Sequence, residues 1–299
     1  LVGAGGKGES VWLGFFLYAA LTQFGALAAQ RGDAAFAQRC AAESARLRDA
    51  IDRSAWDGDW YRRAWFDDGS PLGCAASPEC RIDSIAQSWS VLSGAGEPLR
   101  ARRAMDAVDR LLVQRESALV QLLAPPFDCA EPNPGYIKGY LRGVRENGGQ
   151  YTHAAAWAAM AFAALGDASR AWEVCTLLNP IHHADSAQAI AVYKTEPYAL
   201  ASDVYALAPH AGRGGWTWYT GSAGWMYRCI VESLLGLRVE GNTLRVVPCL
   251  PAHWPSFRIH YRYRETMYHI TVLRAADAGA VPRHSVDGAP RPGQALVLV

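Results

Sequence analysis

The pattern of apolar residues changes at Gly236, and this change constrains the fold of the 299-residue chain more than any other feature. Before Gly236, long stretches with helical periodicity alternate with loops that contain Gly and Pro. Because no strand pattern separates these stretches, the sequence predicts an α/α architecture rather than an α/β one. The predicted helices cover residues 11–31, 34–55, 82–93, 100–112, 152–165, 168–179, 186–191, 201–208 and 222–235.

After Gly236, apolar and polar residues alternate, which is typical of half-buried strands. Strands are predicted over residues 237–239, 243–247, 257–263 and 267–272, and Glu240-Gly241-Asn242 suits a hairpin turn. The sequence therefore predicts a mainly helical region that is followed by a small β region.

The segment from residue 142 to residue 153 is dense in groups that bind ligands. It contains two arginines, Glu146, Tyr151 and His153, and it ends where an alanine-rich helix begins. An ordinary Asn-Gly-Gly turn explains residues 147–149 but not the clustered charges. Glycines allow close backbone approach, and a helix start offers unpaired N–H groups and a positive dipole end. We interpret the segment as the wall of a polar pocket that accepts anions.

A second cluster spans residues 214–225 and leads into another helix. Thr220 and Ser222 are natural N-cap residues, and Gly221 leaves backbone N–H groups open to an anion. No phosphate-binding loop or dinucleotide fingerprint is present, so a nucleotide is not indicated. Aromatic residues beside hydroxyl groups suit a sugar, whose C–H faces stack on rings. The aromatic residues are Trp216, Trp218 and Tyr219.

Composition excludes some functions and leaves the number of domains open. With 51% hydrophobic residues the chain can bury a sizeable core, in one large domain or in two. The 29 basic and 28 acidic residues nearly balance, which argues against a nucleic-acid partner.

Seven cysteines occur without CxxC spacing. Cys74 and Cys80 can pair across a loop or join a metal site, but reduced thiols of a cytoplasmic protein fit the odd count better. No metal is expected, because no group of residues has ligand spacing. His182 and His183 are adjacent and therefore diverge, so we expect surface or cap residues.

Residues 11–29 are almost wholly apolar and reach the length of a membrane span. Thr22 and Gln23 interrupt the run, and no basic flank or cleavage site accompanies it. A helix that is apolar all round is also required inside a large helical barrel. We therefore expect a buried helix of a soluble protein.

Together, these segments resemble the glycoside phosphorylases of glycoside hydrolase family 94 (GH94), and within it the phosphorylase-like domain of cyclic β-1,2-glucan synthases. The resemblance extends to about Val272, with several motifs in the same order. Besides the two clusters above, the matching stretches are Gly6-Lys7-Gly8-Glu9-Ser10-Val11-Trp12-Leu13, Trp56-Asp57-Gly58-Asp59-Trp60-Tyr61, Ile82-Asp83-Ser84-Ile85-Ala86-Gln87-Ser88-Trp89, Tyr193-Lys194-Thr195-Glu196-Pro197-Tyr198 and Pro248-Cys249-Leu250-Pro251.

The resemblance implies the C-terminal part of an (α/α)6 barrel over residues 1–236 and a β-sheet or sandwich cap with a tail over residues 237–299. It also implies inverting chemistry, in which one carboxylic acid protonates the glycosidic oxygen and inorganic phosphate replaces the attacking water. Phosphate is then a co-substrate, and no cofactor is expected. The expected partners are an oligo- or polysaccharide, phosphate and the upstream part of the same polypeptide, with a homodimer left open.

By motif match, the resemblance assigns phosphate binding to His153, Thr220, Gly221 and Ser222. It assigns sugar binding to Tyr140, Arg145, Glu146 and Trp218. The family's general-acid aspartate lies in an Asp-Trp-Asn-Asp-Gly-like segment just upstream of the position that Leu1 occupies. We therefore expect this chain to be a C-terminal piece of a longer polypeptide that contains no general acid and is inactive alone.

Two other functions stay open at this stage. One is a non-catalytic glucan-binding module. The other is an (α/α)6 hydrolase with two facing carboxylates, for which Asp83, Glu146 and Glu196 are candidates. For a phosphorylase we expect a cytoplasmic location, either free or as the cytoplasmic domain of a membrane-anchored synthase.

Overall fold

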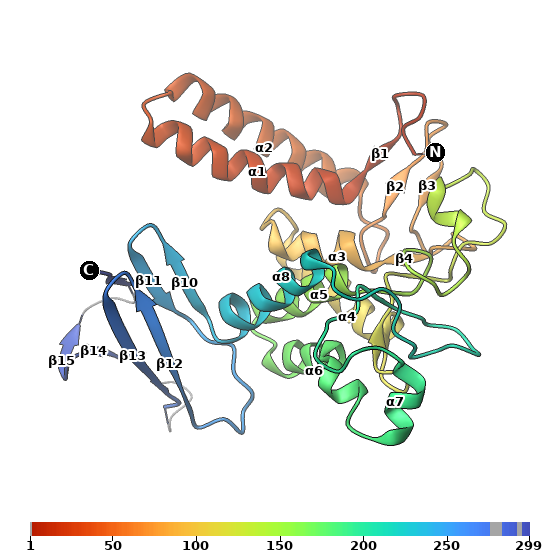
Figure 1. Cartoon of the computed structure of the whole chain (residues 1–299). Coiled ribbons are helices and arrows are strands. Elements are labelled where there is room, and N and C mark those ends of the chain that lie inside the picture. Colours follow the sequence, from red (N-terminus) through yellow and green to blue (C-terminus); the bar gives the residue numbers. More distant parts are fainter. Residues whose placement is uncertain (1, 276–282, 292–294) are drawn as a thin grey trace.

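A computed structural model describes residues 2–275, 283–291 and 295–299 of the chain. Within them, eight α-helices precede a β region (Figure 1). The helices are α1 Val11–Gln30, α2 Ala34–Ser54, α3 Ser84–Leu92, α4 Pro98–Leu111, α5 Thr152–Ala164, α6 Ala168–Leu178, α7 Ala187–Tyr193 and α8 Thr220–Arg228, and a π-helical turn, Cys229–Leu234, continues α8.

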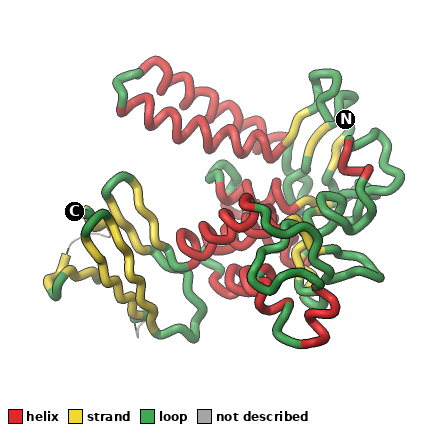
Figure 2. The backbone as a smooth tube through the Cα atoms, in the orientation of Figure 1, coloured by secondary structure: helices red, strands yellow, loops and turns green. Residues whose placement is uncertain are grey.

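Short strands join the loops between these helices (Figure 2). They are β1 Glu9–Ser10, β2 Ala64–Trp65, β3 Pro71–Leu72, β4 Ile82–Asp83, β5 Val113–Gln114, β6 Leu119–Val120, β7 Leu123–Ala124, β8 Gln150–Tyr151 and β9 Asp203–Val204. All nine lie in small antiparallel sheets of two or three strands. They fix the ends of the loops and form no large sheet.

Helix α5 is the centre of the helical core. Nine of its thirteen residues are buried, most of them alanines, and it packs against α3, α4, α6 and α8. Small side chains let four neighbours approach one helix closely, which explains why an alanine-rich segment lies at the middle of the fold. Four of the helices begin at an acidic N-cap residue: Asp33, Asp83, Glu97 and Asp167.

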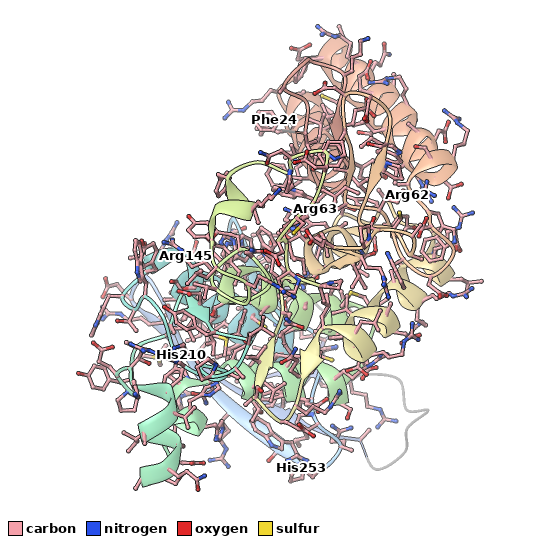
Figure 3. All side chains as sticks on the ribbon, turned by 90° about the vertical axis from the view of Figure 1, so that its right-hand side faces the viewer. Phe24, Arg62, Arg63, Arg145, His210 and His253 are labelled. Atoms are coloured by element: carbon pink, nitrogen blue, oxygen red, sulfur yellow. The ribbon has the colours of Figure 1, made fainter. Side chains whose placement is uncertain are left out.

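Helices α1 and α2 form a hairpin that projects from the rest of the molecule (Figure 1). The prediction of a buried first helix was wrong, because only Val11 and Phe15 of α1 are buried. Helix α2 covers one side of α1, and the other side remains exposed, including Phe24 at the outer part of the hairpin (Figure 3). By length and composition α1 is apolar enough to cross a membrane, and 11% of its most apolar window is buried.

The predicted helix over residues 201–208 was also wrong. This segment is extended, and β9 pairs with β8 through Gln150 opposite Val204 and Tyr151 opposite Asp203. The N–H of Tyr205 donates to the carbonyl of Arg213, at 2.8 Å. Pairing with distant segments therefore outweighs the weak helix propensity of this stretch.

The β region begins at Leu237. Strands β10 Leu237–Glu240, β11 Thr243–Val246 and β16 Ala295–Val297 form one antiparallel sheet, β12 Ser256–Tyr263 pairs with β13 Thr266–Leu273, and β14 His284–Val286 pairs with β15 Ala289–Arg291. The inward faces of the first sheet and of the β12–β13 hairpin share a core around Leu237, Leu244 and Leu298. The predicted alternation and hairpin turn are confirmed, with Gly241 at φ +61°.

All seven cysteines are unpaired, including Cys74 and Cys80. The described residues hold no cluster of three or more side chains that could bind a metal ion. The expectation of surface or cap residues at positions 182 and 183 is confirmed for His182, which is exposed. His183 is instead buried against Tyr193, and its Nε2 lies 2.7 Å from the carbonyl oxygen of Leu177 in the last turn of α6.

Candidate functional site

Helices α5 and α8 run in the same direction, so their N-termini lie at the same end of the core. Trp225 of α8 stacks on His153 at the start of α5, with ring centroids 5.5 Å apart. At the other end, Ser233 lines a cavity together with Ala163 and Ala164, the last residues of α5. Thr220 precedes Trp225 by five residues, which places the α8 N-terminus about 7.5 Å beyond His153 along the helix axis.

His153 is half-buried in an aromatic environment. Besides Trp225, its ring stacks on Tyr151 and meets Trp157 edge-on at 4.4 Å. Burial lowers the pKa of His153 from its usual 6.5, so the imidazole is neutral at pH 7. Its Nε2 atom is buried and has no hydrogen-bond partner within the described residues. A neutral imidazole with one unused nitrogen can donate one hydrogen bond to a ligand or accept one from it.

The first turn of α8 is open rather than capped by a side chain. The prediction that Thr220 or Ser222 caps this helix was wrong, because the N-cap residue is Tyr219 and no side chain accepts a bond from the first turn. Ser222 is buried, and its hydroxyl donates back to the Tyr219 carbonyl at 3.2 Å. Thr220 and Gly221 are exposed, and a Cβ added to Gly221 meets nothing within 4 Å. The unpaired N–H groups of this turn are thus accessible to an anion.

The loop before α5 gathers several of the predicted sugar-binding residues. The guanidinium of Arg145 (labelled in Figure 3) lies 4.1 Å from the centre of the Trp216 ring and 5.2 Å from that of Tyr140. Arg145 has φ +50°, a backbone conformation that non-glycine residues rarely adopt. One carboxylate oxygen of Glu146 is buried without a hydrogen-bond partner among the described residues. The loop therefore presents a charged group and an aromatic face together.

This loop is connected electrostatically to the surroundings of His153. Burial raises the pKa of Tyr151, the neighbouring Glu146 carboxylate raises it further, and the Arg145 guanidinium opposes both effects. Tyr151 in turn stacks on His153 with ring centroids 6.3 Å apart. The Arg145–Glu146 pair and the imidazole thus belong to one polar and aromatic cluster.

Backbone hydrogen bonds hold the aromatic segment at residues 216–219 next to the start of α5. The N–H of Thr152 donates to the carbonyl of Ser202. The N–H of Ser202 in turn donates to the carbonyl of Trp216 at 2.6 Å. The buried Asp203 carboxylate accepts the N–H of Trp216 at 3.1 Å, and a Cβ on Gly215 would lie 2.4 Å from the same carboxylate. Only glycine fits at position 215.

Trp218 is the predicted site residue that lies apart from this cluster. Its indole donates to Glu196 at 3.1 Å, and its ring contacts Tyr198, with both rings largely exposed. Arg145 contacts Trp216 instead, and Trp216 in turn packs near Tyr219 with centroids 5.5 Å apart. The aromatic segment therefore offers two separate faces, one with Trp216 beside Arg145 and one with Trp218 beside Glu196 and Tyr198.

Several residues that organise the site were not recognised from the sequence. Asn147 is fully buried and fixes the loop by bonding the backbone of Phe127 and Tyr140. Asp203 anchors the aromatic segment, and Trp225 packs on His153. A polar residue that is buried by distant segments has no local sequence signal, whereas the position of Trp225 five residues after Thr220 could have indicated proximity to the site.

Of the three carboxylates considered for a hydrolase, Asp83 has structural partners. It caps α3 and forms an ion pair with Arg63. Glu196 is bound by the Trp218 indole, and Glu146 lies next to Arg145.

Comparison with known proteins decides the family. Residues 2–236 match the family described as Glycosyl hydrolase 94 superfamily, catalytic domain. The chain belongs to this family. It is 49% identical over 93% of its length to the cyclic beta-(1,2)-glucan synthase NdvB of Rhizobium meliloti (strain 1021), of which it covers 10%.

Other members of the family are phosphorylases. The chain is 32% identical to the solabiose phosphorylase of Paenibacillus borealis, over 96% of this chain and 37% of that protein. It is 34% identical to the N,N'-diacetylchitobiose phosphorylase of Vibrio furnissii, over 89% of this chain and 33% of that protein. The chain therefore spans between a tenth and two fifths of the length of these relatives.

Two solved structures share the fold at low identity. One is titled "Sialidase", with a TM-score of 0.56 and 12% identity over 85% of this chain and 22% of that one. The other is titled "Glycosidase Wild Type", with a TM-score of 0.50 and 17% identity over 75% of this chain and 51% of that one. At this level of identity the likeness concerns the fold alone.

Proposed function

We propose that the chain is the C-terminal part of an inverting, phosphorylase-type glycosyltransferase that acts on β-linked glucans with phosphate or glucose 1-phosphate. The observation that carries the proposal is the unused, buried Nε2 of His153 at the same end of the core as the open first turn of α8. A neutral donor and a positive helix end favour an oxyanion over a water nucleophile. The similarity to NdvB supports a β-1,2 linkage.

In this proposal His153, Thr220, Gly221 and Ser222 bind the phosphate. The dianion attacks the anomeric carbon while a carboxylic acid protonates the glycosidic oxygen, so that the configuration inverts. Fixed dipoles stabilise charge on the phosphate without reorganising during the reaction. No cofactor is needed, because phosphate itself is the co-substrate.

The sugar would lie against the loop before α5. Tyr140, Arg145 and Glu146 supply hydrogen-bonding and charged groups, and Trp218 supplies a stacking face on the outer side of the aromatic segment. We place these helices in the C-terminal part of an (α/α)6 barrel, over residues 1–236, with residues 237–299 as a separate β cap and tail. A cytoplasmic location is consistent with seven unpaired thiols and with phosphate as a substrate.

A glucan-binding module is the second candidate, and the exposure of the aromatic segment favours it. Trp216 is 53% exposed and Trp218 is 68% exposed, as expected of rings that stack on a sugar chain. A binding module retains affinity for the glucan but shows no phosphate-dependent turnover.

The test is the phosphate dependence of turnover in the protein that carries this chain. His153→Ala should raise the phosphate KM about ten- to hundredfold, because one hydrogen bond to a charged group contributes ~1.5–3 kcal/mol. The thermal midpoint should change little. His182→Ala is the matched control, since that histidine is exposed and lies outside the cluster. A His153 variant that melts early but keeps its phosphate KM would show that the residue is structural.

A further inference from the structure

A cavity lies at the opposite end of α5 from His153. Its volume is about 820 Å³, within the range of roughly 300–1,000 Å³ that small-molecule sites occupy. Ten residues separate His153 from Ala163 at the cavity wall, which corresponds to about 15 Å along the helix. The cavity is lined by residues from the α5–α6 turn, the π-helical turn, β10, β11, the segment 247–250 and the end of β13.

Three arginines line this cavity. Arg238 and Arg245 are directly opposite each other in the β10–β11 pair, and Arg274 follows β13. Like charges directly opposite in an antiparallel pair are destabilising unless something compensates them. Within the described residues none of the three guanidinium groups forms an ion pair, and Glu240 is the one carboxylate in the cavity wall.

Backbone carbonyls, rather than carboxylates, hold two of these arginines in place. The Nε of Arg238 donates to the carbonyl of Glu232 at 3.1 Å. Arg274 donates to the carbonyls of Trp254, Leu250 and Pro251 at distances from 2.7 to 3.1 Å. These bonds orient the two exposed side chains, and within the described residues no carboxylate pairs with either of them.

We propose that this cavity binds a small oxyanion, a phosphate or sulfate group, carried by a ligand of about the size of a sugar. Planar guanidinium groups bind such anions through paired, charge-assisted hydrogen bonds. The hydroxyls of Ser233 and Thr243 lie in the same wall, and Val247, Leu250 and Val272 offer an apolar surface for the rest of the ligand. This site is separate from the one at His153 and does not depend on the proposed function.

Isothermal titration of the protein with sulfate, inorganic phosphate and glucose 1-phosphate tests the proposal. The decisive variant is Arg245→Gln, because no hydrogen bond or ion pair of this side chain is found in the described part of the chain. It should weaken one anion-binding event about tenfold or more, while His153→Ala should leave that event intact. Arg245→Lys keeps the charge but not the paired geometry, and should give an intermediate affinity.

Arg258→Gln is the matched control, since Arg258 is exposed on β12 and lies outside the cavity wall. If the ligand is a phosphorylated sugar, the binding event that depends on Arg245 should have a higher affinity for glucose 1-phosphate than for inorganic phosphate. Equal affinities for the two would identify the free anion as the ligand. Loss of all anion binding in His153→Ala would overturn the cavity proposal and leave the phosphorylase proposal standing. Equal weakening by Arg258→Gln and Arg245→Gln would overturn it as well, because general surface charge then explains the binding.

Discussion

At the scale of single residues, the environment of His153 decides its chemistry. Its ring lies among Tyr151, Trp157 and Trp225, which remove it from water and fix the direction of its free nitrogen. Trp225 belongs to α8 and His153 to α5, so this one stacking contact also links the two helix starts. Trp225 is therefore a positioning residue in the proposed phosphate site.

Trp225→Ala should raise the phosphate KM about two- to tenfold, because an aromatic pair contributes ~0.5–1.5 kcal/mol beyond its burial. Trp225→Phe keeps a stacking ring and should restore most of the affinity. Steady-state kinetics at varied phosphate concentration measure both. Trp172→Ala is a suitable control, because Trp172 packs on Trp254 away from His153 and should affect the melting temperature alone. An unchanged phosphate KM in Trp225→Ala would remove the positioning role.

Single carboxylates also fix the backbone of two loops. Asp67 accepts the backbone N–H groups of Gly5, Lys7 and Gly8, which shapes the glycine-rich loop before α1. These three bonds lower the pKa of Asp67. Glu79 accepts three N–H groups from residues 128–130 in the same manner. Nothing in the sequence near either loop identifies its distant carboxylate.

At the scale of elements, the start of α3 depends on one buried ion pair. Asp83 caps the helix through the N–H groups of Ile85 and Ala86, and its second oxygen pairs with Arg63. Asp83 is 2% exposed, so removal of its carboxylate would leave the Arg63 guanidinium unpaired beside a buried position. Removing one partner of a buried pair typically costs ~3–5 kcal/mol.

Asp83→Ala should therefore lower the free energy of unfolding by about 3 kcal/mol or more. The comparable surface pair is Asp59 with Arg103, both about half-exposed. Asp59→Ala should cost less than about 1 kcal/mol. Urea unfolding followed by circular dichroism gives both values. Equal costs for the two variants would show that the Arg63–Asp83 pair contributes no more than a surface pair.

Elements with a local sequence pattern were predictable, including the short strands β10 and β11, whereas the two-residue strands between the helices were not. Helices α1, α2, α5 and α6 begin at their predicted starts, because helical periodicity is a local signal, and acidic caps also mark α2 and α6. The extended segment around Asp203 was missed, since β8, the strand that pairs with β9, lies more than fifty residues earlier. The site follows the same rule: the motif residues were identified, but the burial of His153 and the role of Asp203 depend on contacts between distant segments.

At the scale of the whole molecule, two histidines and several hydrogen-bonded carboxylates make stability depend on pH in two ranges. Burial lowers the pKa of both His153 and His183, so the folded state binds fewer protons than the unfolded state below about pH 6.5. Stability from these groups is present above pH 6.5 and is lost as the pH falls through their folded-state pKa values. Asp67, Glu79, Glu97 and Asp167 have lowered pKa values, and their contribution is lost at a lower pH.

The melting temperature should therefore fall when the pH drops from about 7.5 to about 5.5, before the carboxylates titrate. His153→Gln should reduce this fall, because it removes one of the two groups that become charged. Differential scanning calorimetry across this range measures the effect. His253→Gln, at another exposed histidine, is the control substitution. A pH profile that is the same in wild type and His153→Gln would mean that the pKa of this histidine is the same in the folded and unfolded states.

The aromatic cluster around His153 has an optical consequence. Trp12, Trp89, Trp157 and Trp225 lie in a continuous series with neighbouring ring centroids 5.3 to 6.1 Å apart, and the series ends at the imidazole. Indoles at such separations exchange excitation energy, and a protonated imidazole quenches indole emission. Light absorbed at the far end of the series can therefore be emitted or quenched beside His153. The ionisation of this one side chain is then readable in the intrinsic fluorescence of the protein, without any added label.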